Sequence, residues 1–385
     1  MRSMADSSAR RYLDNAATSW PKPEAVVAAW SDAATRLGTT AGRAAYHEAA
    51  EADAIRHRAR AAAARLLGGV EPARVALPSG GTLALNIAIQ GLVKPDDHVI
   101  ATAADHNATL RPLHALARRG AITLSLVPCD GLGRVDPADV AAAWRPSTRL
   151  VVMSHASNVT GVAQDVAAIA AAAHDRGGIL LLDAAQSLGQ IPCRVPGFGA
   201  DIVAAPAHKW LMGTSGAAIL WCRAGVEPEP LVLGGTGSHS DSLDMPEAFA
   251  DRLEAGSPDV PALAALAAGL EWLHEPGVAA VAAACGRLAA AAAARLRDLR
   301  GVVVHAVEGG APIVSFTVEH YAPTDVAAML EASAGVQVRA GFHCAALVHD
   351  RLGTRAGGTV RASFGPFNTT TDVECLCTAV AEMVG

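Results

Sequence analysis

The sequence has no excess of positive charge. Its 385 residues include 31 lysine and arginine residues against 37 aspartate and glutamate residues, which gives a net charge of −6. The basic residues are scattered along the chain and form no cluster in one segment. Proteins that bind nucleic acids through the phosphates need a concentrated basic surface. We therefore do not expect a nucleic-acid partner.

Cysteine is also scarce, and long apolar runs are missing. The seven cysteines form an odd set without paired metal-type spacing, so the sequence indicates neither a disulfide framework nor a metal site. This fits a reducing, cytoplasmic setting. The N-terminal MRSMADSSARR lacks the apolar segment of a signal peptide, and runs such as residues 261–270 are too short to span a bilayer. We expect neither export nor membrane anchoring.

The sequence does contain a regular alternation of short apolar runs and helical patterns between residues 74 and 220. Such alternation predicts crossover units around a mainly parallel sheet, so the fold class is α/β. We predict a large domain over residues 12–275 and a smaller α+β domain over residues 276–385, with one long helical stretch from about residue 261 to residue 300. The strand candidates of the large domain are RVAL, HVIAT, TLSLV, RLVVMS, GILLLD, DIVAAP and AAILW.

Three segments place polar residues at the ends of these strands, where ligands gather in such sheets. In LPSGGTLALN, Gly81 and Thr82 open a helix; free N–H groups there favour an anion such as phosphate, although a simple cap explains the same pattern. In GILLLDAAQ, Asp183 ends an apolar strand shortly before Gln186, and its carboxylate either caps a helix or pairs with a protonated ring nitrogen. In APAHKW, Lys209 lies between apolar strands, where a lysine of lowered pKa can form an imine.

These segments, with DHNATLRPL and SHASNVTG, resemble the class V aminotransferase family of fold-type I pyridoxal phosphate enzymes, from YLDNAATSWP to GPFNT. The resemblance implies a pyridoxal 5'-phosphate cofactor, with Lys209 as the Schiff-base residue and Asp183 as the partner of the pyridine nitrogen. Without it, His106 is an ordinary loop histidine and Asn158 a turn residue. The further contacts it implies are Gly81, Thr82 and His208 to the phosphate, His106 stacked on the ring, Gln186 to the ring oxygen, and Asn158 to the ring oxygen or the substrate carboxylate.

Near the C-terminus, VQVRAGFHCAALVHDRLGT and TVRASFG resemble the part of cysteine desulfurases that carries a cysteine and a later arginine. By that resemblance, Cys344 takes sulfur from L-cysteine as a persulfide while L-alanine leaves, and Arg361 binds the substrate carboxylate. Alone, Cys344 would be a small buried apolar residue. His343 is a poor candidate for lowering the thiol pKa, because neighbours in an extended segment point to opposite faces; the cofactor or His106 is better placed. Arg339 either pairs with a nearby carboxylate or helps orient Arg361 for substrate binding.

The resemblance also implies a homodimer with shared active sites. Ser257, in LEAGSPD, would reach the phosphate bound by the neighbouring subunit. Pro206 stands where many desulfurases carry a hydroxyl residue, so one phosphate donor is expected to be missing. The loop GGTGSHSDS differs from that of the best-known desulfurase groups, which leaves open whether a protein or a small molecule accepts the sulfur.

The residues leave three alternatives to a desulfurase. A selenocysteine lyase would use the same pocket and tolerate the loss of Cys344, because selenium leaves more readily. In another class V reaction, a transamination or an epimerisation, Cys344 would be a bystander. A catalytically silent cofactor-binding or sulfur-trafficking protein is disfavoured, because Lys209, Asp183, His106, Cys344 and Arg361 are all present.

Overall fold

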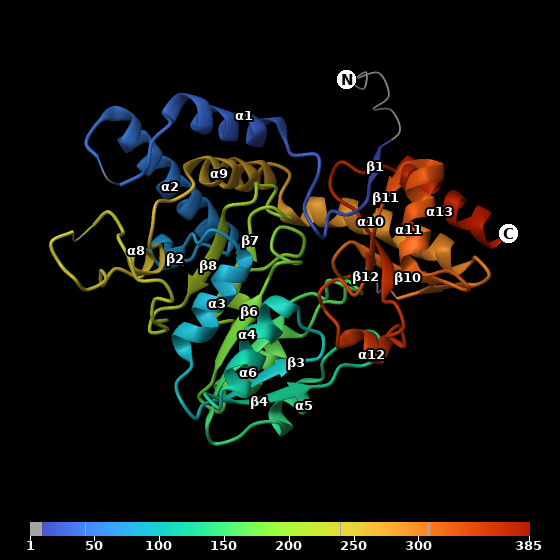
Figure 1. The fold of residues 1–385 in the computed structure, drawn as a ribbon, viewed down its shortest axis with the longest axis horizontal. Coiled ribbons are helices and arrows are strands. Elements are labelled where there is room, and N and C mark those ends of the chain that lie inside the picture. Colours follow the sequence, from blue (N-terminus) through green and yellow to red (C-terminus); the bar gives the residue numbers. More distant parts are fainter. Residues whose placement is uncertain (1–9, 43, 239, 306–308) are drawn as a thin grey trace.

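A seven-stranded sheet forms the centre of the larger unit (Figure 1). The computed structural model describes residues 10–385 except 43, 239 and 306–308. β8 runs opposite to the other six strands of this sheet, so the predicted mainly parallel α/β sheet is confirmed. In spatial order the strands are β2 (Val75–Ala76), β8 (Ala218–Cys222), β7 (Ile202–Pro206), β6 (Ile179–Asp183), β5 (Thr148–Ser154), β3 (His98–Thr102) and β4 (Thr123–Val127).

Both faces of this sheet are buried under helices. In β5, Leu150 and Val152 belong to the core on one face, whereas Val151 and Met153 belong to the core on the other. This two-sided burial explains why the central strands are unbroken apolar runs in the sequence. The helical segments of this unit are α1 (Glu24–Asp32), a π-helical turn η2 (Ala33–Leu37), α2 (His47–Leu66), a 3₁₀ turn η3 (Pro72–Arg74), α3 (Gly81–Leu92), α4 (Asn107–Arg118), α5 (Pro137–Ala142), α6 (Val166–His174), α7 (Val195–Phe198), α8 (Phe249–Leu253) and α9 (Val260–His274).

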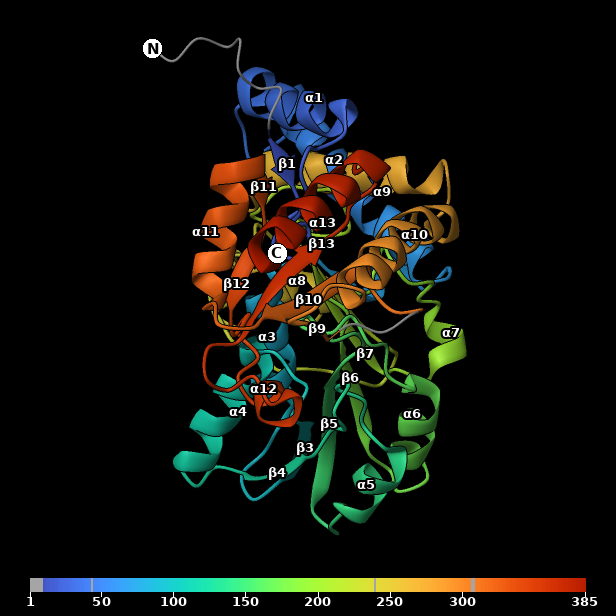
Figure 2. The same ribbon diagram turned by 90° about the vertical axis from the view of Figure 1, so that its right-hand side faces the viewer.

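The C-terminal unit is a four-stranded antiparallel sheet with helices, as the predicted α+β character requires (Figure 2). Its apolar core is formed by strand residues such as Phe316 and Val360 together with helix residues such as Leu330 and Leu376. Its elements are α10 (Val278–Arg297), β9 (Val302–Val304), β10 (Ile313–Val318), α11 (Pro323–Ala334), β11 (Val336–Gln337), β12 (Arg339–Gly341), α12 (Val348–Leu352), β13 (Thr359–Ser363) and α13 (Thr370–Val384).

The predicted single helical stretch over residues 261–300 is wrong. Two helices, α9 and α10, are separated by residues 275–277, because Pro276 is followed by Gly277 at a φ of 78°. A proline disrupts the helical ladder, and a glycine in the left-handed region turns the chain. By length and composition alone α10 is apolar enough to cross a membrane, but its Ala292 and Leu296 lie in the core of the C-terminal unit.

The N-terminal residues connect the two units. β1 (Arg11–Tyr12) pairs in parallel with β11, and Leu13 lies in the core of the C-terminal unit. From there the chain crosses to α1 over the large sheet (Figure 1). The predicted division between residues 275 and 276 falls in the break between α9 and α10 and stays a prediction; residues 11–13 pack with the C-terminal side of it.

Candidate active site

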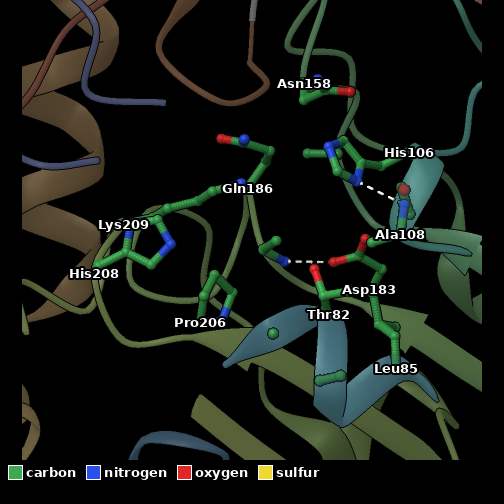
Figure 3. Close-up of a pocket in the computed structure, with 15 residues that line it drawn as sticks. Thr82, Leu85, His106, Ala108, Asn158, Asp183, Gln186, Pro206, His208 and Lys209 are labelled. Carbon is green, nitrogen blue, oxygen red and sulfur yellow. Dashed lines mark hydrogen bonds between the residues drawn. The ribbon is translucent and has the colours of Figure 1, made fainter. Parts of the chain in front are cut away.

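A pocket opens at the carboxyl ends of β5, β6 and β7 and at the starts of α3 and α4 (Figure 3). Small or apolar side chains such as Ala156, Ala204 and Leu85 form parts of its wall. The topology of parallel sheets brings the carboxyl ends of neighbouring strands to one edge, so residues distant in sequence meet there. Eight predicted site residues line it: Gly81, Thr82, His106, Asn158, Asp183, Gln186, His208 and Lys209.

Lys209 and Asp183 are the two charged groups of this pocket; Asp183 is buried and Lys209 is partly buried. Burial lowers the pKa of Lys209 to about 8, and the carboxylate of Asp183 opposes that shift. Burial raises the pKa of Asp183, while the N–H of Ala185, which donates to the carboxylate over 2.9 Å, and the charge of Lys209 lower it. A lysine whose amine is partly neutral near physiological pH is a competent nucleophile and base.

His106 is held in one orientation as the N-cap of α4. Its Nδ1 accepts a hydrogen bond from the N–H of Ala108 at 3.0 Å (Figure 3). The proton of the neutral ring therefore resides on Nε2. Burial and the positive charges of Lys209 and Arg339 lower the pKa of His106 to about 4, so the ring is neutral at pH 7. A neutral, fixed imidazole suits the predicted stacking role.

The anion site is predicted at the start of α3. Gly80 caps this helix without any side-chain hydrogen bond to its first N–H groups. A Cβ on Gly81 would lie 3.2 Å from the Cβ of Pro206, which explains why glycine stands at this position. Pro206 itself ends β7, lines the pocket and has no hydroxyl group. Thr82 offers the side-chain hydroxyl at this edge of the pocket.

An N-terminal segment, residues 14–22, which we call the strap, hydrogen-bonds to residues that line the pocket. The side chain of Thr18 and the ammonium of Lys22 donate to the carbonyl of His208, each over 2.9 Å, and the N–H of Ser19 does so over 3.0 Å. This carbonyl belongs to the residue just before Lys209, so the strap fixes the peptide that carries the lysine. Burial lowers the pKa of Lys22 to about 8.

Gln186 is also fixed by this strap. Its amide nitrogen donates to the carbonyl of Ala16 over 3.0 Å, and its amide oxygen accepts from the indole of Trp210 over 2.8 Å. Gln186 lines the pocket, as expected, but both ends of its amide already have protein partners. Its predicted contact with a ring oxygen stays a prediction.

Arg361, on β13, is buried with a side-chain exposure of only 1%. Its Nη2 lies 2.8 Å from a carboxylate oxygen of Asp14, and its Nη1 donates to the carbonyl of Asn158 over 2.9 Å. The Nε is buried and has no hydrogen-bond partner. A buried donor without a partner is costly unless a ligand accepts from it, and a carboxylate is the natural acceptor for a guanidinium.

Cys344 lies on an unusual loop beside this arginine. His343 and Cys344 have φ angles of 51° and 59°, so the segment is not extended, and the reason given above for discounting His343 is wrong. His343 is instead removed from the thiol by burial, with Nε2 against the backbone and hydroxyl of Thr359; burial lowers its pKa to about 2. Cys344 is exposed, unlike the other six cysteines, of which Cys375 is partly and the rest fully buried.

The positive group nearest to this thiol was not identified from the sequence. Arg339 places its Nη2 3.7 Å from the Sγ of Cys344. It stands opposite Arg361 in the pairing of β12 with β13, and among the described residues it forms no salt bridge with a carboxylate, so its predicted role in orienting Arg361 stays a prediction. The loop is anchored by the N–H of Asn107, which donates to the carbonyl of Cys344 over 2.7 Å, and by Asn158, whose amide donates to the carbonyl of His343 over 2.6 Å. Cys344 also lies close enough to Lys209 for its charge to act on the lysine pKa.

The sequence profile of the family described as aminotransferase class-V matches residues 11–376. The chain belongs to this family. Among curated relatives, a "Probable cysteine desulfurase" of Methanothermobacter thermautotrophicus is 32% identical, covering 97% of this chain and 94% of the relative. One of Pseudomonas aeruginosa with the same name is 34% identical, covering 94% of this chain and 91% of the relative. The apo structure of a cysteine desulfurase from Thermococcus onnurineus superposes with a TM-score of 0.90 at 29% identity, covering 97% and 94% of the two chains.

These matches confirm the class V resemblance and the fold. They do not assign roles to single residues of this class V chain, so the predicted roles stay predictions that the geometry makes specific. Two residues of the site were missed: Asp14, which pairs with Arg361, and Asp105, which accepts backbone hydrogen bonds behind His106. Ser257 is exposed and does not line the pocket of its own chain, so its role toward a neighbouring subunit is untested.

Proposed function

We propose that this protein is a pyridoxal 5'-phosphate-dependent cysteine desulfurase, which converts L-cysteine to L-alanine and retains the sulfur on Cys344. The observation that carries the proposal is the arrangement of three groups around Asn158, a pocket residue that hydrogen-bonds both Arg361 and the carbonyl of His343 next to Cys344. Lys209 lies in the buried pocket, Arg361 presents a buried Nε without a partner, and the exposed thiol of Cys344 lies beside Arg339. The curated relatives with the desulfurase name support this assignment.

The residues of the pocket fit the cofactor. An uncapped start of α3 can bind a phosphate, the carboxylate of Asp183 can pair with a pyridinium, and Lys209 can hold an aldehyde covalently through Nζ. When bound, pyridoxal phosphate acts as an electron sink that weakens the bonds at the α-carbon of an amino acid. His106 would lie against the ring and His208 beside the phosphate.

The protein groups then have separate tasks. Arg361 binds the carboxylate of L-cysteine through its unpartnered Nε and so fixes the substrate beside Lys209. Lys209, whose pKa is lowered to about 8, takes the proton from the α-carbon as a neutral amine. Cys344 attacks the sulfur of the substrate as a thiolate; the carbon–sulfur bond breaks and a sulfur–sulfur bond forms. L-Cysteine and the Cys344 thiol thus yield L-alanine and a Cys344 persulfide, without any external oxidant.

One experiment separates this proposal from its rivals. Wild type, Cys344→Ala and Lys209→Ala are each given L-cysteine or L-selenocysteine, and alanine is measured together with sulfide or selenide. We expect Lys209→Ala to be inactive with both substrates and Cys344→Ala to lose only the reaction of L-cysteine. Sulfide release by Cys344→Ala at the wild-type rate would refute the role of the thiol, and release of a keto acid without alanine would indicate transamination.

The cofactor has an independent readout. The chain has only three lysines, Lys22, Lys94 and Lys209, so borohydride reduction followed by peptide mapping can locate an attached pyridoxyl group unambiguously. We expect it on Lys209 alone. Attachment to Lys22 or Lys94 would refute the proposed site even if the protein turned yellow.

We further propose that the protein is a homodimer in a cytoplasmic setting. The segment between β8 and α8 exposes Leu233 and Leu243, with exposed fractions of 73% and 106%, and apolar side chains this exposed favour a partner surface. Seven free cysteines fit a reducing compartment. Sedimentation of wild type and of Leu243→Glu tests the dimer; identical monomeric masses would refute it.

A further inference from the structure

A groove on the outer surface lies next to the loop that carries His343 and Cys344. It is formed by α4, by the edge strand β4 and by Ala346 and Leu347, which follow Cys344 closely in the chain. Its apolar wall includes Leu110 and Leu126, and Leu126 is 48% exposed although it is a large apolar side chain. None of the pocket residues described above lines this groove.

The rest of the groove is positively charged. Arg111, Arg118, Arg119 and His114 line it, and no acidic side chain does. Among the residues that the structure describes, none of these arginines forms a salt bridge, and all three are exposed. The chain as a whole carries a net charge of −6, so the groove is opposite in sign to the net charge of the protein.

Helix electrostatics explain only part of this charge. Arg118 and Arg119 lie at the C-terminal end of α4, where the helix dipole favours cations. Arg111 lies in the N-terminal half of the same helix, where the dipole gives no such benefit. A ligand with negative charge accounts for all three positions at once.

The groove is continuous with the sulfur-carrying loop. Asn107 lines it, and the N–H of the same residue donates to the carbonyl of Cys344 over 2.7 Å. An occupant of the groove therefore lies directly beside the residue that carries sulfur under the proposed function. Under the proposed function Cys344 carries a persulfide, and a nucleophile is needed to remove the sulfur. A ligand of this groove is placed to bring that nucleophile to Cys344.

We propose that this groove binds a protein that accepts the sulfur, through a segment in which acidic and apolar side chains flank a reactive cysteine. This inference rests on the proposed function. The acidic groups pair with Arg111, Arg118 and Arg119, and an apolar side chain covers Leu126. The acceptor thiolate attacks the outer sulfur of the Cys344 persulfide; the old sulfur–sulfur bond breaks, a new one forms on the acceptor, and Cys344 leaves as a thiolate. The step is redox-neutral.

Two synthetic peptides test the groove. Each has a central cysteine between two leucines; one is flanked by glutamates and the other by lysines. Transfer from the persulfide is measured by mass spectrometry, and binding by fluorescence anisotropy on Cys344→Ala, which needs no persulfide. We expect the glutamate peptide to bind and react at least about tenfold better at low salt, with the difference shrinking as salt is added.

Matched variants locate the effect. Arg119→Glu and Leu126→Ser lie in the groove, whereas Arg300→Glu and Val303→Ser change an exposed arginine and an exposed side chain on the edge strand β9 of the other sheet. We expect only the groove variants to lose binding and transfer, with alanine formation in the presence of a small thiol unchanged in all four.

Three outcomes would overturn the inference. The first is equal behaviour of the two peptides. The second is a change of oligomeric state in Arg119→Glu, which would make the groove a subunit interface. The third is a wild-type protein that binds the peptide but forms no persulfide on Cys344 when given L-cysteine, which would refute the proposed function and with it the sulfur-acceptor role. A loss of binding in Arg119→Glu while persulfide still forms on Cys344 supports it.

Discussion

The cofactor pocket and the sulfur-carrying region are built in opposite ways. In the pocket, Asp183 ends β6 and is buried, and Lys209, which follows the end of β7 closely, is partly buried; the sheet itself positions both residues. In the other region, Cys344 is exposed on a loop with left-handed backbone angles and is positioned by contacts between the two units. A residue that holds a cofactor in place needs a fixed position from which water is excluded. A thiol that must receive sulfur and pass it on needs to be accessible to its reaction partners.

Among the variants that test this contrast, we expect Arg361→Gln to cause the largest loss of kcat/KM. Arg361 is buried and paired with Asp14, so its loss removes the carboxylate site and leaves an unpaired charge, at a cost of about 4 kcal/mol or about 1,000-fold in kcat/KM for L-cysteine. The absorbance of bound cofactor should persist. Arg58→Gln, which breaks an exposed ion pair with Glu271, serves as the control. If cofactor binding fell together with kcat/KM, the two regions would not be separable.

The next largest effect is expected on stability, from Asp105, which lies next to His106 of the pocket. Asp105 is fully buried and accepts the N–H of Thr102 with one oxygen and the N–H of Ser154 with the other. Because an amide has only one oxygen, Asp105→Asn leaves one buried N–H unpaired, and we expect a loss of about 2 kcal/mol in the free energy of unfolding in urea. In the control Asp130→Asn, both N–H bonds go to a single oxygen at an exposed site. Equal losses would contradict this account.

The contrast between the sheet-based pocket and the loop of Cys344 also explains which features could be predicted from the sequence. The strands β5 to β8 were predicted because burial on both faces leaves unbroken apolar runs; Asp183 ends one such run and Lys209 follows another closely. The break between α9 and α10 had a local signal, Pro276 with Gly277, that the helical pattern of the flanking residues masked.

The missed contacts have no local signal. The pair of Asp14 and Arg361 joins residues 347 positions apart, and no spacing rule connects them. The contact of Arg339 with Cys344 depends on left-handed angles at two residues that are neither glycine nor asparagine, the types that normally reveal such a turn. Tertiary contacts fix these angles, so only the folded chain shows them.

The strap offers a test of whether the two regions are linked. Asp14 holds the guanidinium of Arg361 without lining the pocket, so Asp14→Asn should misplace the arginine and raise KM about 20-fold with little change in kcat. Asp14→Glu should recover part of this loss. Asp32→Asn, which removes an exposed ion pair with Arg36, should have no effect. A fall in kcat alone would mean that the strap acts on Lys209 instead.

Cofactor uptake should depend on pH in the way that the buried lysine dictates. The pKa of Lys209 is lowered to about 8, so the amine is mostly protonated at pH 7 and mostly neutral at pH 9. Only the neutral amine attacks an aldehyde, so the initial rate of cofactor binding, followed by absorbance, should rise about tenfold over that range and then level off. The free ε-amine of acetyl-lysine should keep gaining reactivity up to about pH 10.5. A rise of the protein rate that continued in parallel would contradict a lowered pKa.

The smallest effect is expected in the exposed region around Cys344. Arg339 places its Nη2 3.7 Å from the Sγ of Cys344, but it is partly exposed, so solvent screens much of its charge. We therefore expect Arg339→Gln to slow alkylation of Cys344 by iodoacetamide about threefold at pH 7, a modest change because access to the thiol is unaltered. Arg339→Lys should retain most of the rate, and the buried cysteines should stay unreactive in every variant. A loss as large as that of Arg361→Gln would show instead that Arg339 binds the substrate, and the sulfur-carrying region would then be as tightly organised as the pocket.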